Sequence, residues 1–216
     1  MAILNAAHLK FLLDGLLWTV GLSLIAFVGG GLLGFLVALG AYYGPAWSRR
    51  LVRWYIKLIQ GTPLLVLLPL AYFGLPALGL NISPLAAAAL ALSVYVSAYL
   101  GEIWRGCIES VPRTQAEAAE CLALRWHQRV WHVILPQAVK IATPPTVGFM
   151  VQIVKNTSLA SAIGFVELAR AGQIINNSTF EPFVIFLVVA AMHFALCYPL
   201  SVLSRRLERS FHVAHR

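Results

Sequence analysis

Long apolar stretches alternate with short polar ones along almost the whole chain. Apolar residues dominate at about 16–43, 54–75, 85–109, 138–163 and 183–203. Several of these stretches exceed the roughly 20 residues that a helix needs to cross the hydrocarbon core of a bilayer. Aromatic residues flank the first stretch, as is typical of membrane interfaces: Trp18 lies near one end and Tyr42, Tyr43 and Trp47 near the other. The pattern predicts an all-α membrane protein with five transmembrane helices.

The composition departs from that of a soluble protein in the direction that a bilayer requires. The 216 residues are 60% apolar and 11% charged, with a mean hydropathy of +0.79. Soluble domains are about half apolar and about a quarter charged. A cleavable signal peptide has a much shorter apolar region after a basic start, so we expect the first span to be retained. We predict a single transmembrane domain over residues 1–216.

The net charge of +8 is distributed unevenly between the spans. Lys and Arg concentrate in the 44–57 and 105–140 regions and after the fifth span, whereas the 76–84 connection has none and the 164–182 connection has Arg170 alone. Basic residues accumulate on the cytoplasmic side of membrane proteins. We therefore expect an outside N-terminus and an inside C-terminus. Membrane lipid, and not nucleic acid, is the expected partner of this charge.

Glycine and proline interrupt the apolar stretches at particular positions. Gly30 and Gly34 form a GxxxG pair, which allows two membrane helices to approach closely. Proline inside a helix removes a hydrogen bond and usually kinks it, and such positions recur in three of the five predicted spans: Gly61-Thr62-Pro63 with Pro69, Pro144-Pro145, and Pro199. The recurrence favours a protein with an internal path over rigid packing.

Polar side chains at membrane depth are the candidates for lining such a path, because they are rare there and usually functional. The candidate translocation-path residues are Gln60, Thr62, Tyr95, Ser97, Tyr99 and His193. A buried, hydrogen-bonded histidine is the competing interpretation of His193. Glu102 and Arg105 are three residues apart, and we expect a structural ion pair between them.

The connection at about 112–136 is too polar to enter lipid. Thr114 and Glu117 have the spacing of a capping box, which predicts a short helix over about 115–124. A second amphipathic stretch, with Val130, Val133 and Ile134 on one side, ends at Leu135-Pro136. Exposed apolar residues of such an element need another surface to cover them. The pattern predicts a docking element on the cytoplasmic face.

The motifs in this connection resemble those of the permease subunits of bacterial ABC importers, in the polar amino acid group. Glu117-Ala118-Ala119, followed at a distance by Ile134-Leu135-Pro136, is similar to the EAA motif in the cytoplasmic loop of these permeases. Further matches, in the same order, are Gly61-Thr62-Pro63-Leu64-Leu65, Gly101-Glu102-Ile103-Trp104-Arg105-Gly106 and Lys155-Asn156-Thr157-Ser158-Leu159. The resemblance covers about residues 15–209 and implies a subunit that translocates histidine, glutamate, glutamine, arginine, an opine or a related compound.

The resemblance also implies a location in the bacterial cytoplasmic (inner) membrane, together with partners and contacts. It implies a cytoplasmic ABC ATPase dimer that binds ATP and Mg²⁺, a second permease subunit that is identical or different, and a periplasmic or lipid-anchored solute-binding protein. It places Glu117, Ala118, Ala119 and Leu122 against the ATPase, with Leu135-Pro136 closing the motif. The family usually has glycine where this chain has Ala123 and Thr114. If the turn after the helix requires positive φ, alanine strains it at Ala123.

No GxxxxGK[ST] phosphate-binding sequence occurs in the chain, so the energy for uphill transport must come from another polypeptide. We expect a non-catalytic subunit with no cofactor and no metal site of its own. The three cysteines form no CxxC pair, and the histidines form no HExxH motif. A self-sufficient channel or secondary carrier is the alternative, and it would need charged sites in the membrane or a pseudo-repeat. A membrane-embedded enzyme is a second alternative.

Overall fold

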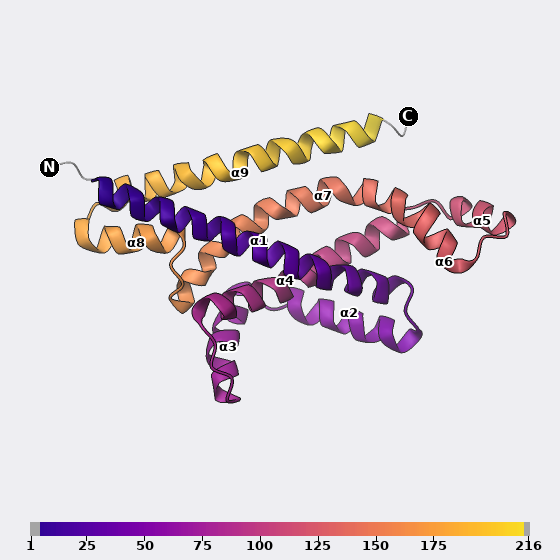
Figure 1. The fold of residues 1–216 in the computed structure, drawn as a ribbon, viewed down its shortest axis with the longest axis horizontal. Helices are drawn as coiled ribbons and strands as arrows, with labels where there is room; N and C mark the ends of the chain where they lie inside the picture. The colour runs from indigo at the N-terminus through magenta and orange to yellow at the C-terminus, as the bar shows by residue number, and fades with distance from the viewer. Residues whose placement is uncertain (1–4, 214–216) are drawn as a thin grey trace.

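The computed structural model describes residues 5–213, and every regular element in that range is a helix (Figure 1). In chain order the elements are α1 Ala6–Tyr42, α2 Ala46–Gln60, α3 Leu64–Ala77, α4 Pro84–Glu109, α5 Arg113–Cys121, α6 Trp126–Gln128, a π-helix Arg129–Ile134, α7 Leu135–Asn156, a 3₁₀ helix Thr157–Ile163, α8 Leu168–Thr179 and α9 Pro182–Val213. The all-α fold class predicted from the sequence is confirmed.

Three single helices are long and apolar enough to cross a membrane: α1, α4 and α9. Two bent pairs bring the possible number of spans to 5 if each pair counts as one span, namely α2 with α3 and the Trp126–Ile163 segment with α8. The described chain therefore has between three and five candidate spans. The predicted third span is accurate, because Ser83 caps α4 by accepting a hydrogen bond from the Ala86 amide.

The predicted second span, 54–75, is divided into two helices, α2 and α3, at the Gly61-Thr62-Pro63 interruption that the sequence indicated. The axes of α2 and α3 differ by 101°, and α3 points away from the long helices in Figure 1. Gly61 ends α2 and Pro63 precedes α3. Proline has no amide hydrogen and disfavours the helical conformation in the residue before it, so Pro63, directly after Gly61-Thr62, accounts for the break.

Other boundaries differ from the sequence-based prediction by whole turns. Helix α1 begins at Ala6 because the side chain of Asn5 accepts a hydrogen bond from the His8 amide at 2.8 Å. Helix α9 extends to Val213. The 164–182 connection, expected as a loop, contains α8, which Glu167 caps through hydrogen bonds from two backbone amides. Helices α7 and α9 continue through their prolines.

The close packing of α1 on α4 depends on small residues. A Cβ atom added at Gly30 would lie 2.8 Å from the backbone oxygen of Ser93, and one added at Gly34 would lie 3.1 Å from that of Ser97. The predicted role of the Gly30–Gly34 pair as a helix-packing surface is therefore confirmed. The two backbones approach more closely than side chains would permit.

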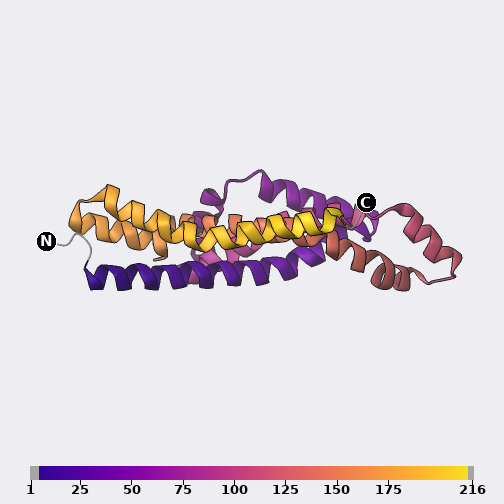
Figure 2. The same cartoon turned by 90° about the horizontal axis from the view of Figure 1, so that it is seen from above.

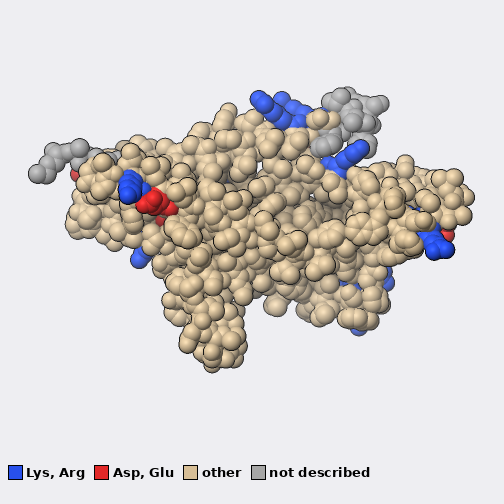
Figure 3. Space-filling view, in the orientation of Figure 1, with Lys and Arg blue, Asp and Glu red and all other residues tan. Residues whose placement is uncertain are grey.

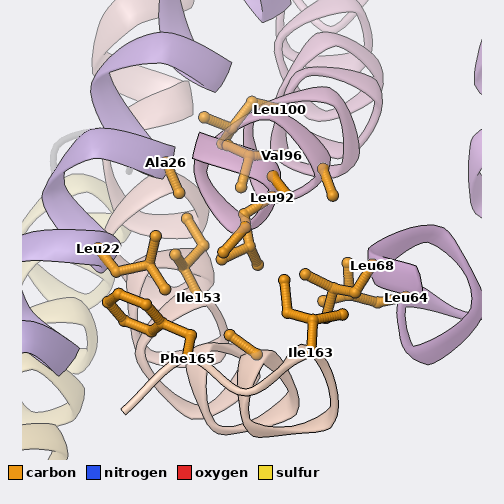
Figure 4. Close-up of a cluster of buried hydrophobic side chains, with 14 residues drawn as sticks. Leu22, Ala26, Leu64, Leu68, Leu92, Val96, Leu100, Ile153, Ile163 and Phe165 are labelled. Carbon is orange, nitrogen blue, oxygen red and sulfur yellow. The ribbon is translucent and has the colours of Figure 1, made fainter. Parts of the chain in front are cut away.

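The main buried cluster lies where α1, α3, α4, α7 and the 3₁₀ helix meet (Figure 4). Leu22, Leu68, Leu92 and Leu100 are fully buried there. Leucines on the outer surface of the same helices are exposed, for example Leu17 and Leu32 at 69% each. In Figure 3 the visible charged side chains lie near the left end and at several places over the right half of the molecule, and the tan zone between these two parts shows none. An apolar exterior of this kind is suited to lipid and not to water.

Candidate coupling segment and translocation surface

The connection between α4 and α7, residues 112–136, projects beyond the long helices at one end of the molecule (Figures 1 and 2). It consists of α5, α6 and the π-helix, so both predicted amphipathic elements are present. The predicted capping box is wrong: α5 begins at Arg113, and its N-cap, Pro112, makes no side-chain hydrogen bond. Pro112 has no amide hydrogen to donate to a glutamate side chain, and Thr114 lies already within the helix.

This connection has a small core of its own. Val130, Ile134 and Leu135 are buried together with Ile108 and Val111. The carboxylate of Glu120 pairs with the guanidinium of Arg129 at 2.7 Å, which links α5 to the π-helix. Tyr43 packs edge-on against Trp126, with ring centroids 5.3 Å apart. These contacts hold the connection in a defined position relative to α4 and α7.

The structure divides the predicted coupling residues into two groups. Ala119 and Leu135 are buried at 4% and 8% exposure and contribute to the inner packing. Glu117, Ala118, Leu122, Ala123 and Pro136 are on the surface. Leu122 is 75% exposed, and Trp126 and Trp131 are also exposed. An uncovered leucine and two uncovered tryptophans outside the lipid-facing helices are typical of a protein-binding surface.

The turn after α5 has the left-handed residue that the resemblance led us to suspect. Ala123 has φ 56°. The amide of Leu124 donates to Ala119 O at 3.2 Å and the amide of Ala123 donates to Glu120 O at 2.9 Å. This is the Schellman arrangement, in which the left-handed position is usually glycine. The turn forms with alanine, at the energetic cost of placing a Cβ atom in this region.

The candidate path residues do not form one group. Tyr95 and Tyr99 lie together on α4 with ring centroids 4.5 Å apart, and Tyr99 stacks on Phe149 of α7. Gln60 is exposed at the end of α2, and the hydroxyl of Thr62 donates to Leu58 O. These positions remain candidates for a path.

Ser97 and the Glu102–Arg105 pair have structural contacts. Ser97 is fully buried, and its hydroxyl lies 2.5 Å from that of Tyr55 on α2. In this structure Ser97 is therefore a packing contact between α2 and α4, and not a surface residue. The predicted ion pair is confirmed, with Arg105 Nε donating to Glu102 at 2.9 Å.

A further polar side chain, Lys155, was named in a family motif but was not among the candidate path residues. It lies within the predicted fourth span, is exposed near the end of α7, and borders the same cavity as His193 of α9. The adjacent Asn156 accepts a hydrogen bond from Gln152 at 3.1 Å. The available signal was a lysine well inside an apolar stretch, which is rare enough to indicate a function.

An apolar helical bundle with a projecting, uncovered helical connection is typical of a polytopic membrane protein that binds a partner outside the lipid. The family model described as "Binding-protein-dependent transport system inner membrane component" matches residues 30–213. The chain belongs to this family, and it is a permease subunit of an ABC transporter.

Several relatives are similar over most of their length. The probable glutamine ABC transporter permease protein GlnP of Bacillus subtilis is 35% identical over 93% of this chain and 94% of its own. The L-cystine transport system permease protein TcyB of the same organism is 34% identical over 90% of this chain and 86% of its own. The glutamine transport system permease protein GlnP of Escherichia coli is 32% identical over 93% of each chain.

Solved structures agree with the fold. The crystal structure of an amino acid ABC transporter with histidines superposes with a TM-score of 0.88 at 33% identity, covering 94% of this chain and 95% of that chain. An inward-facing MetNI methionine ABC transporter superposes with a TM-score of 0.81 over 96% and 99% of the two chains, at 19% identity. The second likeness concerns the fold alone.

Proposed function

We propose that this chain carries a polar amino acid or a related compound across the cytoplasmic membrane, driven by an ATPase that docks on the connection between α4 and α7. The uncovered surface of Leu122, Trp126 and Trp131 carries this proposal. Exposed aromatic and aliphatic side chains on a polar element indicate a protein partner. Relatives named for glutamine and L-cystine transport support the substrate class.

The proposed mechanism has two states. ATP and Mg²⁺ bind the partner ATPase dimer, whose closure moves the connection over residues 112–136. Helix α7 continues directly from the π-helix at Leu135, so motion of the connection is transmitted to a membrane helix without a flexible joint. A ligand changes the equilibrium between two states only by binding them with different affinity. The ATPase supplies that difference through Glu117, Ala118, Leu122 and the residues around them.

The complete importer in this proposal also contains a second permease subunit and a solute-binding protein. Five spans, with α2–α3 and α7–α8 each counted as one, place the N-terminus outside and the C-terminus inside. This orientation puts the connection and the arginines of α9 on the same side of the membrane, as the distribution of basic residues requires. It also puts α8 on the outer side.

The test is a charge reversal on the surface of α5. Glu117 is exposed and makes no ion pair within residues 5–213, so Glu117→Lys changes the surface without disturbing the inner packing. We expect loss of co-purification with the ATPase and loss of uptake, with normal membrane insertion. Glu208→Lys is the matched control, because Glu208 is exposed at the cytoplasmic end of α9 under this topology. Normal uptake by the Glu117→Lys importer would contradict the docking role.

A further inference from the structure

Helix α2 has three different faces along its length, and only one of them packs on the rest of the chain. On that face Ile56 and Ile59 are buried. The hydroxyl of Tyr55 donates a hydrogen bond to Val94 O of α4 at 3.1 Å and lies 2.5 Å from the Ser97 hydroxyl. These contacts hold α2 against α4 and fix the directions in which its other two faces point.

The second face of α2 is an exposed apolar stripe. Its residues are 4, 3 and 4 positions apart, which places them on one side of a helix with 3.6 residues per turn. They are between 63% and 70% exposed: Trp47, Leu51, Trp54 and Leu58. Tryptophan is enriched where a protein meets the boundary between lipid and water, because its ring is apolar and its N–H is polar. The stripe is therefore suited to the chains and the interface of a bilayer.

The third face of α2 is basic. The helix contains no acidic residue, and its cations are all exposed: Arg49, Arg50, Arg53 and Lys57. Arg50, Arg53 and Lys57 are 3 and 4 positions apart and lie about 100° around the helix from the apolar stripe. Figure 3 shows basic side chains at the lower right, where α2 lies in Figure 1. The ion pairs formed within residues 5–213 involve none of these cations, so the described part of the chain does not neutralise them.

The basic face lies where the apolar exterior of α1 ends. A Cβ atom added at Gly40 of α1 would lie 3.4 Å from the side chain of Val52, so α2 turns back beside the last turns of α1. Leu36 is the last large apolar side chain that α1 exposes. The row from Arg49 to Lys57 is roughly 12 Å long. The headgroup layer is about 5–8 Å thick on each side of a bilayer, and long basic side chains reach toward it from deeper positions. The row therefore coincides with the level of lipid phosphates.

We infer that α2 is a binding site for anionic phospholipid. The phosphate group of the lipid contacts the basic face at Arg50, Arg53 and Lys57, and an acyl chain lies along the apolar stripe. Charge complementarity and the adjacent stripe both support this occupant, because a helix with a basic face beside an apolar face binds anionic membranes through the two together. Under the proposed orientation the lipid belongs to the cytoplasmic leaflet, where anionic lipids give a negative surface potential. The inference goes beyond the proposed function, because it holds for any transported solute.

The experiment measures lipid binding at α2 itself, in the complete importer with its ATPase, second permease and binding protein in nanodiscs. Leu51→Cys, on the apolar stripe beside Arg50, carries a bimane fluorophore, in an importer whose other cysteines are alanine, including Cys107, Cys121 and Cys197. The nanodiscs contain equal amounts of phosphatidylglycerol and phosphatidylcholine. In each preparation only one of the two lipids carries bromine atoms on its acyl chains, which quench the bimane on contact. The ratio of the two quenching efficiencies gives the preference of this site for the anionic lipid.

We expect brominated phosphatidylglycerol to quench more than brominated phosphatidylcholine. Each basic residue near an anionic surface contributes roughly a fivefold factor, so Arg53→Gln should lower the preference about fivefold. Replacing Arg50, Arg53 and Lys57 together by glutamine should abolish it, whereas Arg53→Lys keeps the charge and should retain it. The matched control replaces Arg205, Arg206 and Arg209 of α9 by glutamine. These arginines are exposed, and their loss removes the same total charge from another helix, so the preference at α2 should not change.

Four results would overturn the inference. Equal quenching by the two lipids would show that α2 does not select anionic lipid, and an equal loss of preference in the α9 variant would assign the selection to overall charge. Quenching by neither lipid would mean that a protein subunit, such as the second permease, covers α2. Loss of the preference on adding inorganic phosphate, but not chloride at the same ionic strength, would assign the basic face to a soluble anion. None of these measurements requires transport, so they are independent of the test of the proposed function.

Discussion

Replacing Ala123 by glycine should stabilise the connection between α4 and α7. The amides of Ala123 and Leu124 donate to Glu120 O and Ala119 O, and the geometry places Ala123 at φ 56°. For a residue with a Cβ atom this conformation costs roughly 1–2 kcal/mol. Glycine removes that cost but adds unfolded-state entropy worth about 0.5–1 kcal/mol. The net gain in local stability is therefore about 0–1.5 kcal/mol, with a central value of about 0.75 kcal/mol.

Replacing Ala118 by glycine should change the stability in the opposite direction, because Ala118 is not in a strained conformation. Ala118 is exposed inside α5, where the backbone is helical. Glycine in a helix interior is less favourable than alanine by about 0.8–1 kcal/mol. The two substitutions thus remove an identical methyl group on neighbouring surface positions, and only the backbone conformation distinguishes them.

Hydrogen exchange of the α5 peptide amides in the assembled transporter measures both effects. A change of about 1 kcal/mol corresponds to roughly a fivefold change in the opening equilibrium. We expect slower exchange in Ala123→Gly and faster exchange in Ala118→Gly. Faster exchange in both variants would refute the reasoning, because it would mean that the left-handed turn imposes no cost on alanine.

Three further perturbations test the packing and the topology. Gly30→Ala should reduce the stability by about 1–3 kcal/mol through overpacking, seen as a lower melting temperature, since the new Cβ would lie 2.8 Å from Ser93 O. Gly21→Ala, with nothing within 4 Å of its Cβ, should be neutral or stabilising. Glu167→Ala should destabilise α8 by about 1–2 kcal/mol in thermal unfolding because two amides lose their acceptor, and the exposed Glu181 replaced by alanine should change stability by less than about 0.5 kcal/mol; equal effects would contradict the capping role. A reporter enzyme fused to the C-terminus should be active only in the cytoplasm, and periplasmic activity would exclude the proposed orientation.

Local sequence signals were sufficient for several features of the fold. Helix α4 was predicted almost to the residue, because Ser83-Pro84 is a strong helix start whatever its surroundings. The position of the docking element followed from the loss of apolar character after α4. The strain at Ala123 was suspected from the family resemblance and is present in the backbone. Helix α8 was missed because its polar sequence lacks the hydrophobic signal of a span.

Non-local packing decided the candidate path. Ser97 and Tyr95 are two residues apart in the sequence, yet Ser97 is fully buried against Tyr55 of α2 while Tyr95 lies beside Tyr99. Lys155 and His193 border one cavity although 38 positions separate them in the sequence. No pattern within a single helix distinguishes a polar side chain that faces a neighbour from one that faces an open cavity.

The sequence by itself determined that this is an all-α membrane protein, where α4 begins, where the second apolar stretch breaks, and which long connection is too polar for lipid. These properties depend on transfer of nearby residues between water and lipid and on local backbone chemistry. Only the tertiary structure decided which coupling residues stay exposed and which basic groups share a cavity. Those outcomes depend on how helices distant in the chain pack together, because the neighbouring helix decides whether a side chain is buried with a partner or remains exposed.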